Sequence, residues 1–111
     1  MTTPDPALVN LAYGLYLSFQ RGAGIFATGE PYPVAAWTAL RDCDRERYLR
    51  RAMRFRQNAH LHPALRFYES WTECAPHYTK PWDRINPGLR ALWATVADEW
   101  AALEAERRAA A

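Results

Sequence analysis

The sequence contains little cysteine and a single lysine among its 111 residues. The two cysteines, Cys43 and Cys74, are too few for the disulfide framework that holds small secreted domains together. The first residues also lack the charged and then apolar pattern of a secretory signal peptide. These absences predict free thiols, a reducing compartment and a cytoplasmic location.

Long apolar runs are absent as well. The longest run, residues 7–19, is interrupted by Asn10, Gly14 and Ser18, whereas a helix needs about 20 predominantly apolar residues to cross a bilayer. We therefore expect no membrane partner. A run of this length and composition is typical of a buried helix instead.

Spacings typical of an active site or a metal centre are also missing. His60 and His62 precede one expected helix, and Cys74 and His77 follow it. Zinc takes four such ligands, but a helix of about 12 residues would hold the two pairs roughly 18 Å apart. No nucleophile–base pair or pair of carboxylates stands out elsewhere. The sequence predicts no catalytic residue, no metal ligand, no cofactor and no enzyme, and a small-ligand or metal-binding domain is kept as an alternative.

What the sequence has in abundance is aromatic residues, fifteen in all, of which five are tryptophan. Rings at this density are buried in a core or used at an interface. A chain of 111 residues buries about two-thirds of its unfolded surface, which is enough for an independent fold. We expect a single helical domain over residues 1–111 with an aromatic core.

The clearest helix signal lies near the C-terminus. Asn86 is a favoured N-cap residue, and Pro87 suits the first helical position. Apolar residues then recur on one helical face at Leu89, Leu92, Trp93, Val96, Trp100 and Leu103. The pattern predicts a helix from Pro87 that buries this face, continues into residues 101–111 and frays there.

Another helix is predicted near the N-terminus. Asp5 followed by Pro6 gives an N-cap and a first-turn proline. The pattern extends to about Gln20 or Arg21, and Gly22 supplies a C-terminal stop. Apolar residues occupy nearly every side of this helix, which is typical of a central helix or an interface helix. A homodimer contact is therefore left open.

The segment after this helix, residues 22–33 (GAGIFATGEPYP), is rich in glycine and proline and predicts a long loop. Its Gly-x-Gly start suggests a phosphate-binding loop. No strand pattern precedes it and no Gly-Lys-Ser/Thr ends it, so neither nucleotide-binding fingerprint is matched. We interpret the segment as a structural connector.

Two further helices are predicted in the middle of the chain. The expected elements are a turn at residues 34–40, a helix from Asp42 or Asp44 to about Gln57, a link at residues 58–62 and a helix from Pro63 to about Cys74. Aspartate is a favoured N-cap residue, and proline suits a first turn. The predicted core includes Trp37, Tyr48, Trp71, Trp82, Trp93 and Trp100.

The two halves of the chain share a residue pattern. Trp37, Leu40, Arg45, Tyr48 and Ala52 match Trp82, Ile85, Arg90, Trp93 and Ala97 at one constant offset. At an offset seven residues larger, Ala12, Leu15, Tyr16 and Phe19 match Ala64, Phe67, Tyr68 and Trp71. Each half, about residues 6–57 and 62–108, is then a helical hairpin. The sequence predicts an all-α fold, a four-helix arrangement of two duplicated helical hairpins.

Positive charge is concentrated locally, although the net charge is only +2. Residues 41–56 hold seven of the fourteen basic residues and three acids. On a helix, Arg47, Arg50, Arg51 and Arg54 share one flank and are the predicted binding residues. One interpretation is a solvated face whose arginines pair with acids one turn away. The other is a docking surface for an acidic partner, either a protein or, as the alternative, nucleic acid.

The tryptophan segments resemble a known pattern. Pro-x-Pro before Trp37, and Pro81-Trp82-Asp83-x-Ile85 followed by Arg90 and Trp93, resemble the segment P-x-W-x-x-L-x4-R-x-x-W of small helical proteins from bacteriophages and actinobacteria. An early tryptophan segment, the helix residue Trp71 and a later Pro-aromatic-Asp segment are also similar to phage proteins with a ryanodine-receptor-type domain. The resemblance implies a phage or mobile-element accessory protein. We therefore expect a non-enzymatic protein-interaction module that modulates or inhibits a host protein.

Overall fold

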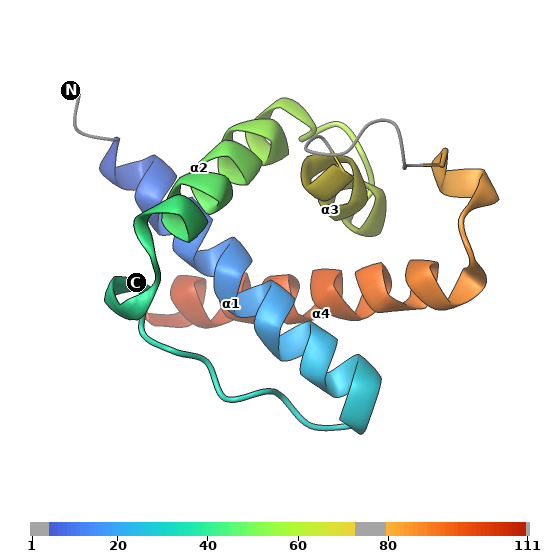
Figure 1. The fold of residues 1–111 in the computed structure, drawn as a ribbon, viewed down its shortest axis with the longest axis horizontal. Helices are drawn as coiled ribbons and strands as arrows, with labels where there is room; N and C mark the ends of the chain where they lie inside the picture. Colours follow the sequence, from blue (N-terminus) through green and yellow to red (C-terminus); the bar gives the residue numbers. More distant parts are fainter. Residues whose placement is uncertain (1–4, 73–79, 111) are drawn as a thin grey trace.

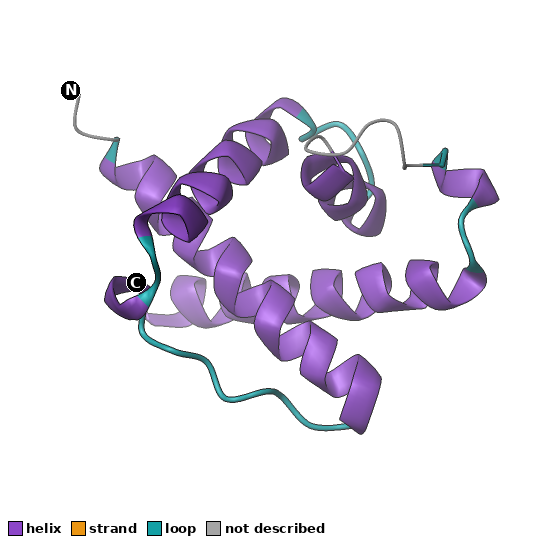
Figure 2. Cartoon of the chain, in the orientation of Figure 1, coloured by secondary structure: helices purple, strands orange, loops and turns teal. Residues whose placement is uncertain are grey.

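The computed structural model describes residues 5–72 and 80–110. Its elements, in chain order, are helix α1 (Pro6–Thr28), 3-10 turn η1 (Trp37–Ala39), helix α2 (Asp42–Gln57), helix α3 (Pro63–Thr72), 3-10 turn η3 (Trp82–Arg84) and helix α4 (Pro87–Ala110). These two ranges contain no strand (Figure 2), which confirms the predicted all-α fold with four helices. None of the helices in the described ranges is both long and apolar enough to cross a membrane.

The two long helices, α1 and α4, cross each other and pack together (Figure 1). They run in opposite directions. Gly22, late in α1, lies against Val96 in the middle of α4. Arg107, near the end of α4, donates to the Asn10 carbonyl oxygen near the start of α1, at 3.4 Å. Helix α2 packs on α1, and α3 packs on α2 and α4. Helix α1 is thus covered by two helices, which accounts for much of its apolar surface, and the homodimer stays a prediction.

The predicted helix starts at Asp5 and Asn86 are confirmed. The Asp5 side chain accepts a hydrogen bond from the Ala7 N–H at 3.0 Å, and the Asn86 side chain accepts one from the Gly88 N–H at 2.7 Å. In both cases a proline follows the capping residue, where its missing N–H leaves no helical bond unmade.

The first helix is longer than predicted. It continues through Gly22 and ends at Thr28, so the predicted stop at Gly22 is wrong, and the predicted loop over residues 22–33 is confirmed only for residues 29–33. The stop is Gly29, whose φ of 85° lies in the left-handed region that glycine adopts without a steric penalty. The Gly29 N–H donates to the Ile25 carbonyl oxygen at 2.8 Å and closes the helix.

Gly22 and Gly24 lie inside α1 because other segments approach its backbone there. A Cβ on Gly22 would lie 2.7 Å from Val96 Cα, and a Cβ on Gly24 would lie 2.2 Å from the Tyr32 backbone nitrogen. Both distances are far shorter than any real contact of a Cβ. These glycines therefore serve close packing within the helix and not a turn.

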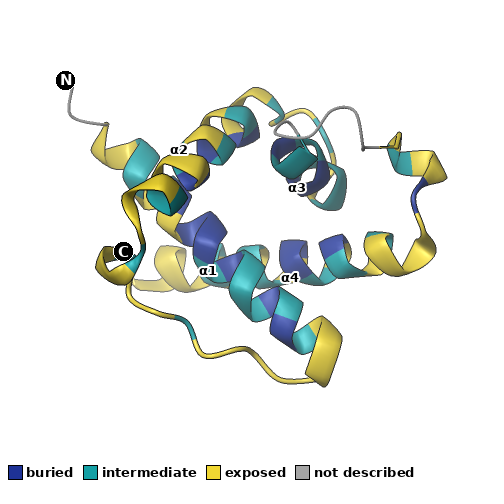
Figure 3. Cartoon of the chain, viewed as in Figure 1, coloured by how far each residue is buried: buried dark blue, intermediate teal, exposed yellow. Residues whose placement is uncertain are grey.

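The core lies between the four helices (Figure 3). Its buried members are Ala12, Leu15, Tyr16, Tyr48, Ala52, Phe55, Phe67, Tyr68, Ile85, Trp93, Val96 and Ala97. Two of the six predicted aromatic core residues, Tyr48 and Trp93, are in this set, and the other four are partly buried against it. Leu89, predicted on the buried face of the last helix, is 48% exposed. The reason is that the start of α4, residues 87–89, and the capping residue Asn86 face solvent.

Each 3-10 turn is tied to an earlier helix by a tyrosine. The two hydrogen bonds run from the Tyr16 hydroxyl to the Ala35 carbonyl oxygen at 2.9 Å and from the Tyr68 hydroxyl to the Lys80 carbonyl oxygen. Each acceptor lies two residues before the tryptophan of its turn, Trp37 or Trp82. Both buried tyrosines thus satisfy their hydroxyl groups. The duplication of the two hairpins stays a prediction.

Candidate binding face on helix α2

Helix α2 has a buried side and a solvent side. The buried side carries Tyr48, Ala52 and Phe55, and the opposite side carries Arg50, Met53 and Gln57. This division follows from 3.6 residues per turn, since residues three and seven positions apart share a face. We call the solvent side, with the adjoining Arg47 and Arg54, the outer face of α2.

The C-terminal half of the outer face contains an open cavity of about 290 Å³, lined by Arg50, Met53, Arg54 and Gln57. Met53 is 51% exposed. A flexible thioether left exposed between two arginines can be covered by an apolar group of a partner. The two guanidinium groups favour a partner whose neighbouring groups are negative.

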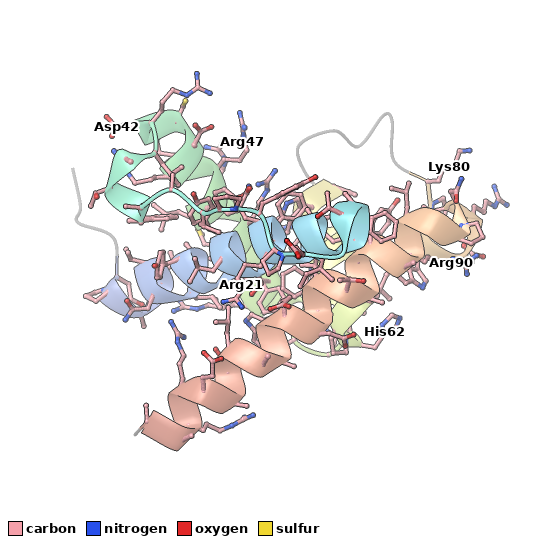
Figure 4. The ribbon with its side chains drawn as sticks, turned by 90° about the horizontal axis from the view of Figure 1, so that it is seen from below. Arg21, Asp42, Arg47, His62, Lys80 and Arg90 are labelled. Atoms are coloured by element: carbon pink, nitrogen blue, oxygen red, sulfur yellow. The ribbon has the colours of Figure 1, made fainter. Side chains whose placement is uncertain are left out.

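The four predicted arginines have different surroundings. Arg47 and Arg50 are exposed, and Figure 4 shows the Arg47 side chain projecting from α2 away from the body of the molecule. Arg47 Nη1 lies 3.6 Å from the Asp44 carboxylate. Arg54 is half-buried and lines the cavity. The structure thus brings Arg50 and Arg54 together at one cavity.

Arg51 has a structural contact that the sequence pattern did not reveal. Its guanidinium carbon lies 4.9 Å from the centre of the Tyr48 ring and 4.7 Å from the centre of the Trp71 ring. A cation over two rings is stabilised by their negative faces. Arg51 therefore covers the edge of the aromatic core, and its guanidinium is less available to a partner than that of Arg50.

The acids of α2 are concentrated in its first turn. Asp42 pairs with Arg45, and Asp44 accepts a hydrogen bond from Arg41 Nε at 3.0 Å. The hydrogen bond from Arg41 holds the pKa of the Asp44 carboxyl below its ordinary value. Acids in the first turn suit the positive end of the helix dipole. The C-terminal half, residues 50–57, holds four arginines and no acid.

We predict that replacing Arg41 with alanine raises the pKa of Asp44. A lowered pKa means that the ion pair contributes stability above the ordinary carboxyl pKa of about 4 and loses it as the pH falls through the folded value. The measurement is an NMR titration of the Asp44 side-chain carboxyl in wild type and Arg41→Ala. Arg84→Ala removes a distant exposed arginine and serves as the control. An Asp44 titration that is the same in all three proteins contradicts the pairing.

Met53 and Gln57 are absent from the predicted binding residues. Their positions, three and seven residues after Arg50, did carry the signal that they share its face. The exposure of Met53 follows from the helix rotation that Tyr48 and Phe55 impose by facing the core.

The two histidines within the described residues, His60 and His62, lie at the surface. His62 is exposed; its Nδ1 accepts from the Leu65 N–H at 3.3 Å, and its ring centre lies 5.5 Å from that of Trp82. His60 is exposed. Cys74 and His77 lie outside the described residues. In the part of the chain that is described, no three metal-ligand side chains come together.

Comparison of the chain with family models, with curated proteins and with solved structures finds no match. No residue role is carried over from another protein, so function is inferred from the geometry of the described residues.

Proposed function

We propose that this chain is a non-enzymatic protein-interaction module that binds an acidic partner protein through the outer face of α2. The observation that carries the proposal is the cavity in which Met53 stands half-exposed beside Arg50, Arg54 and Gln57. Arginines are expected on any surface, and the exposed Met53 adds an apolar group between Arg50 and Arg54 in the same cavity. An apolar anchor ringed by charges is the arrangement of an interface with a hydrophobic centre and a polar rim.

The partner that fits this face is an amphipathic segment, such as a helix, with one apolar side chain flanked by carboxylates. The apolar side chain would cover Met53 while the carboxylates lie near Arg50 and Arg54. Arg47, one turn away, would extend the positive field and speed association more than it strengthens binding. The tryptophan-segment resemblance supports a phage or mobile-element accessory protein whose partner is a host protein. The exposed, free thiol of Cys43 suits a reducing cytoplasm.

The proposal predicts that charge reversal on the outer face removes partner binding. Affinity capture from a nuclease-treated host-type lysate compares wild type, Arg50→Glu/Arg54→Glu and the control Arg84→Glu/Arg108→Glu. Arg84 and Arg108 are exposed basic residues outside α2, so the control makes the same change in net charge. We expect at least about a tenfold loss of captured partner for the α2 variant alone, since a buried charge pair at an interface costs several kcal/mol when broken. Met53→Ala should weaken capture without lowering thermal stability.

Equal capture by the α2 variant and its control would contradict the proposal. Loss of capture with a lower melting temperature would point to misfolding, so the melting curves of all variants are recorded in the same buffer. These curves separate a binding defect from a folding defect.

Nucleic acid is the other acidic partner that an arginine stripe suits. Two observations disfavour nucleic acid. The Arg51 guanidinium packs over the Tyr48 and Trp71 rings, and the exposed rings of the described residues, Tyr13, Phe26 and Tyr32, lie outside α2. Base stacking on this face therefore has no ring to use. Titration with single-stranded and duplex oligonucleotides at low salt should show no binding at micromolar protein. A phosphate-binding stripe would instead show affinity that falls with salt, log K by about 0.9 per contact for each tenfold increase.

A further inference from the structure

A second cavity lies on another part of the molecule, between α1 and the C-terminal half of α4. It measures about 260 Å³, and its lining includes Tyr13, Gly14, Trp100, Glu104, Glu106 and Arg107. Arg107 is held on its wall: Nη1 pairs with the Glu104 carboxylate at 3.3 Å, and Nη2 donates to the Asn10 carbonyl oxygen at 3.4 Å. The groove thus offers two rings, two carboxylates and one guanidinium. None of these residues belongs to the outer face of α2.

Contacts in one half of the chain recur at matched positions in the other half. The Tyr16 and Tyr68 hydroxyls each donate to a carbonyl oxygen just before the following 3-10 turn. The Ser18 hydroxyl donates to the Gly14 carbonyl oxygen, and the Ser70 hydroxyl donates to the Arg66 carbonyl oxygen, both at 2.7 Å. The ring centres of Phe19 and Trp93 are 5.7 Å apart, and those of Trp71 and Tyr48 are 5.9 Å apart. In this correspondence Arg66 is the counterpart of Gly14, and Phe55 is the counterpart of Trp100.

Arg66 shows what a side chain does at this position. Its guanidinium carbon lies 3.6 Å from the centre of the Phe55 ring and 5.6 Å from the centre of the Trp100 ring, and its Nε donates to the Phe55 carbonyl oxygen at 2.8 Å. The Phe55 and Trp100 rings are themselves in contact, with centres 5.2 Å apart. One side of this ring pair is therefore covered by the chain's own guanidinium. At the counterpart position Gly14 has no side chain, and the groove lies there.

We propose that the groove between α1 and α4 binds a guanidinium group, that of an arginine side chain presented by another protein. The group would lie beside Gly14 against Trp100, as the Arg66 guanidinium lies against Phe55. Trp100 and Tyr13 line the groove, and the bound cation would lie against their rings. Glu104 and Glu106 supply the opposite charge and outnumber Arg107, the one cation on the wall. A guanidinium suits this site better than an ammonium because it is planar, stacks on rings and is weakly hydrated.

Gly14→Arg tests whether the groove accepts a guanidinium. A Cβ built on Gly14 meets no described atom closer than Arg107 Nη2 at 3.9 Å, an ordinary contact, so the backbone leaves room for a side chain to start there and the longer arginine would have to lie beside Arg107. Gly14→Ala is the matched control, because it makes the same change from glycine within a helix but leaves the groove open. We expect Gly14→Arg to melt about 4 °C or more above Gly14→Ala, as the added cation covers a ring.

A titration tests binding directly and does not depend on how that variant folds. The probe is N-acetyl-arginine methylamide, with the lysine analogue and free L-arginine in parallel, and the readout is the indole N–H signal of Trp100, assigned with Trp100→Phe. We expect the blocked arginine to shift this signal in wild type and Gly14→Ala, the lysine analogue to bind at least several-fold more weakly, and Gly14→Arg not to respond. Glu104→Gln should weaken binding about two- to fivefold, and Arg107→Gln should strengthen it by a similar factor.

Several results would overturn the proposal. A Trp100 signal that the blocked arginine leaves unchanged at tens of millimolar removes the site. An equal response to the lysine analogue contradicts the preference for guanidinium over ammonium. A response to free L-arginine alone contradicts the claim that the arginine is a side chain of another protein. Effects of the opposite sign for Glu104→Gln and Arg107→Gln would show that Glu104 and Arg107 do not act on the probe as the charges of a cation site, which contradicts the proposal. If self-association supplies the arginine, sedimentation will show a dimer of wild type and Gly14→Ala that Gly14→Arg abolishes, and the occupant is then a second copy.

Discussion

Replacing Trp93 with alanine should lower the free energy of unfolding by about 3–5 kcal/mol, the range for removing a large ring from a well-packed core. Trp93 is 7% exposed. Its ring centre lies 5.7 Å from that of Phe19 on α1, 5.7 Å from that of Trp71 on α3 and 6.4 Å from that of Tyr68 on α3. Trp93 therefore joins three helices, and its loss leaves a cavity that each of them would have to move to fill.

Urea unfolding followed by far-ultraviolet circular dichroism measures this loss as a shift of the midpoint at constant slope. Trp82→Ala is the control: Trp82 is only partly buried on the turn η3, so its removal should cost clearly less. Trp93→Phe keeps a ring and should fall between wild type and Trp93→Ala. A Trp93→Ala midpoint equal to that of wild type would mean that Trp93 is not in the core.

Much of the fold could be predicted from local chemistry. Asp5 and Asn86, each followed by a proline, marked two helix starts. A side-chain oxygen at the N-cap accepts from a free N–H of the first turn, and proline at the first helical position leaves no helical hydrogen bond unmade. Helix α2 runs from Asp42 to Gln57, within the expected bounds, but its N-cap residue is Arg41 and no side chain caps it, so the expected aspartate cap is wrong. The turn at Trp37 was expected within residues 34–40, and the turn η3 at Trp82 forms where the same residue pattern repeats in the second half.

What failed depended on contacts between segments far apart in sequence. Gly22 gives the same local signal whether it ends a helix or lets a second helix approach, and only the position of Val96 decides between them. Leu89 fits the apolar stripe of α4, yet its turn extends into solvent. Periodicity defines the face of a helix, but not how far along the helix a partner reaches.

The candidate site was predicted only in part, because it too depends on contacts between segments far apart in sequence. Charge counting located the basic segment and the helix period placed four arginines on one flank, but both methods ignore packing. The Arg51 guanidinium packs over the ring of Trp71, which lies on another helix. The exposure of Met53 follows from which residues of α2 face the core. The groove beside Gly14 could not be predicted, since an absent side chain gives no chemical signal until its surroundings are known.

Gly22→Ala should destabilise the fold by about 1–3 kcal/mol, the usual cost of forcing extra atoms into a packed site. Alanine is favoured over glycine inside a helix by about 1 kcal/mol, so local preference alone predicts the opposite sign. The contact with α4 outweighs it: the added Cβ would lie 2.7 Å from Val96 Cα, 2.9 Å from Val96 Cγ2 and 3.0 Å from the Val96 backbone nitrogen. Two of these atoms are backbone, so relief requires α1 and α4 to move apart.

Gly14→Ala is the matched control for this prediction, because Gly14 lies in the same helix and is also buried, while its Cβ would meet only Arg107 Nη2, at 3.9 Å. Gly14→Ala should therefore gain stability, by up to about 1 kcal/mol from helix preference, while Gly22→Ala loses it. Thermal melts of both variants and wild type in one buffer give the two signs. If Gly22→Ala melts at or above wild type, α1 does not pack backbone to backbone on α4 at Val96.

A helix that ended at Gly22, as its sequence alone predicts, would also lose stability with alanine, but for a different reason: its glycine would be a left-handed cap. The two cases separate with Gly29→Ala: in the structure Gly29 has the cap and open space around it, so Gly29→Ala should also destabilise, which a helix ending at Gly22 does not require.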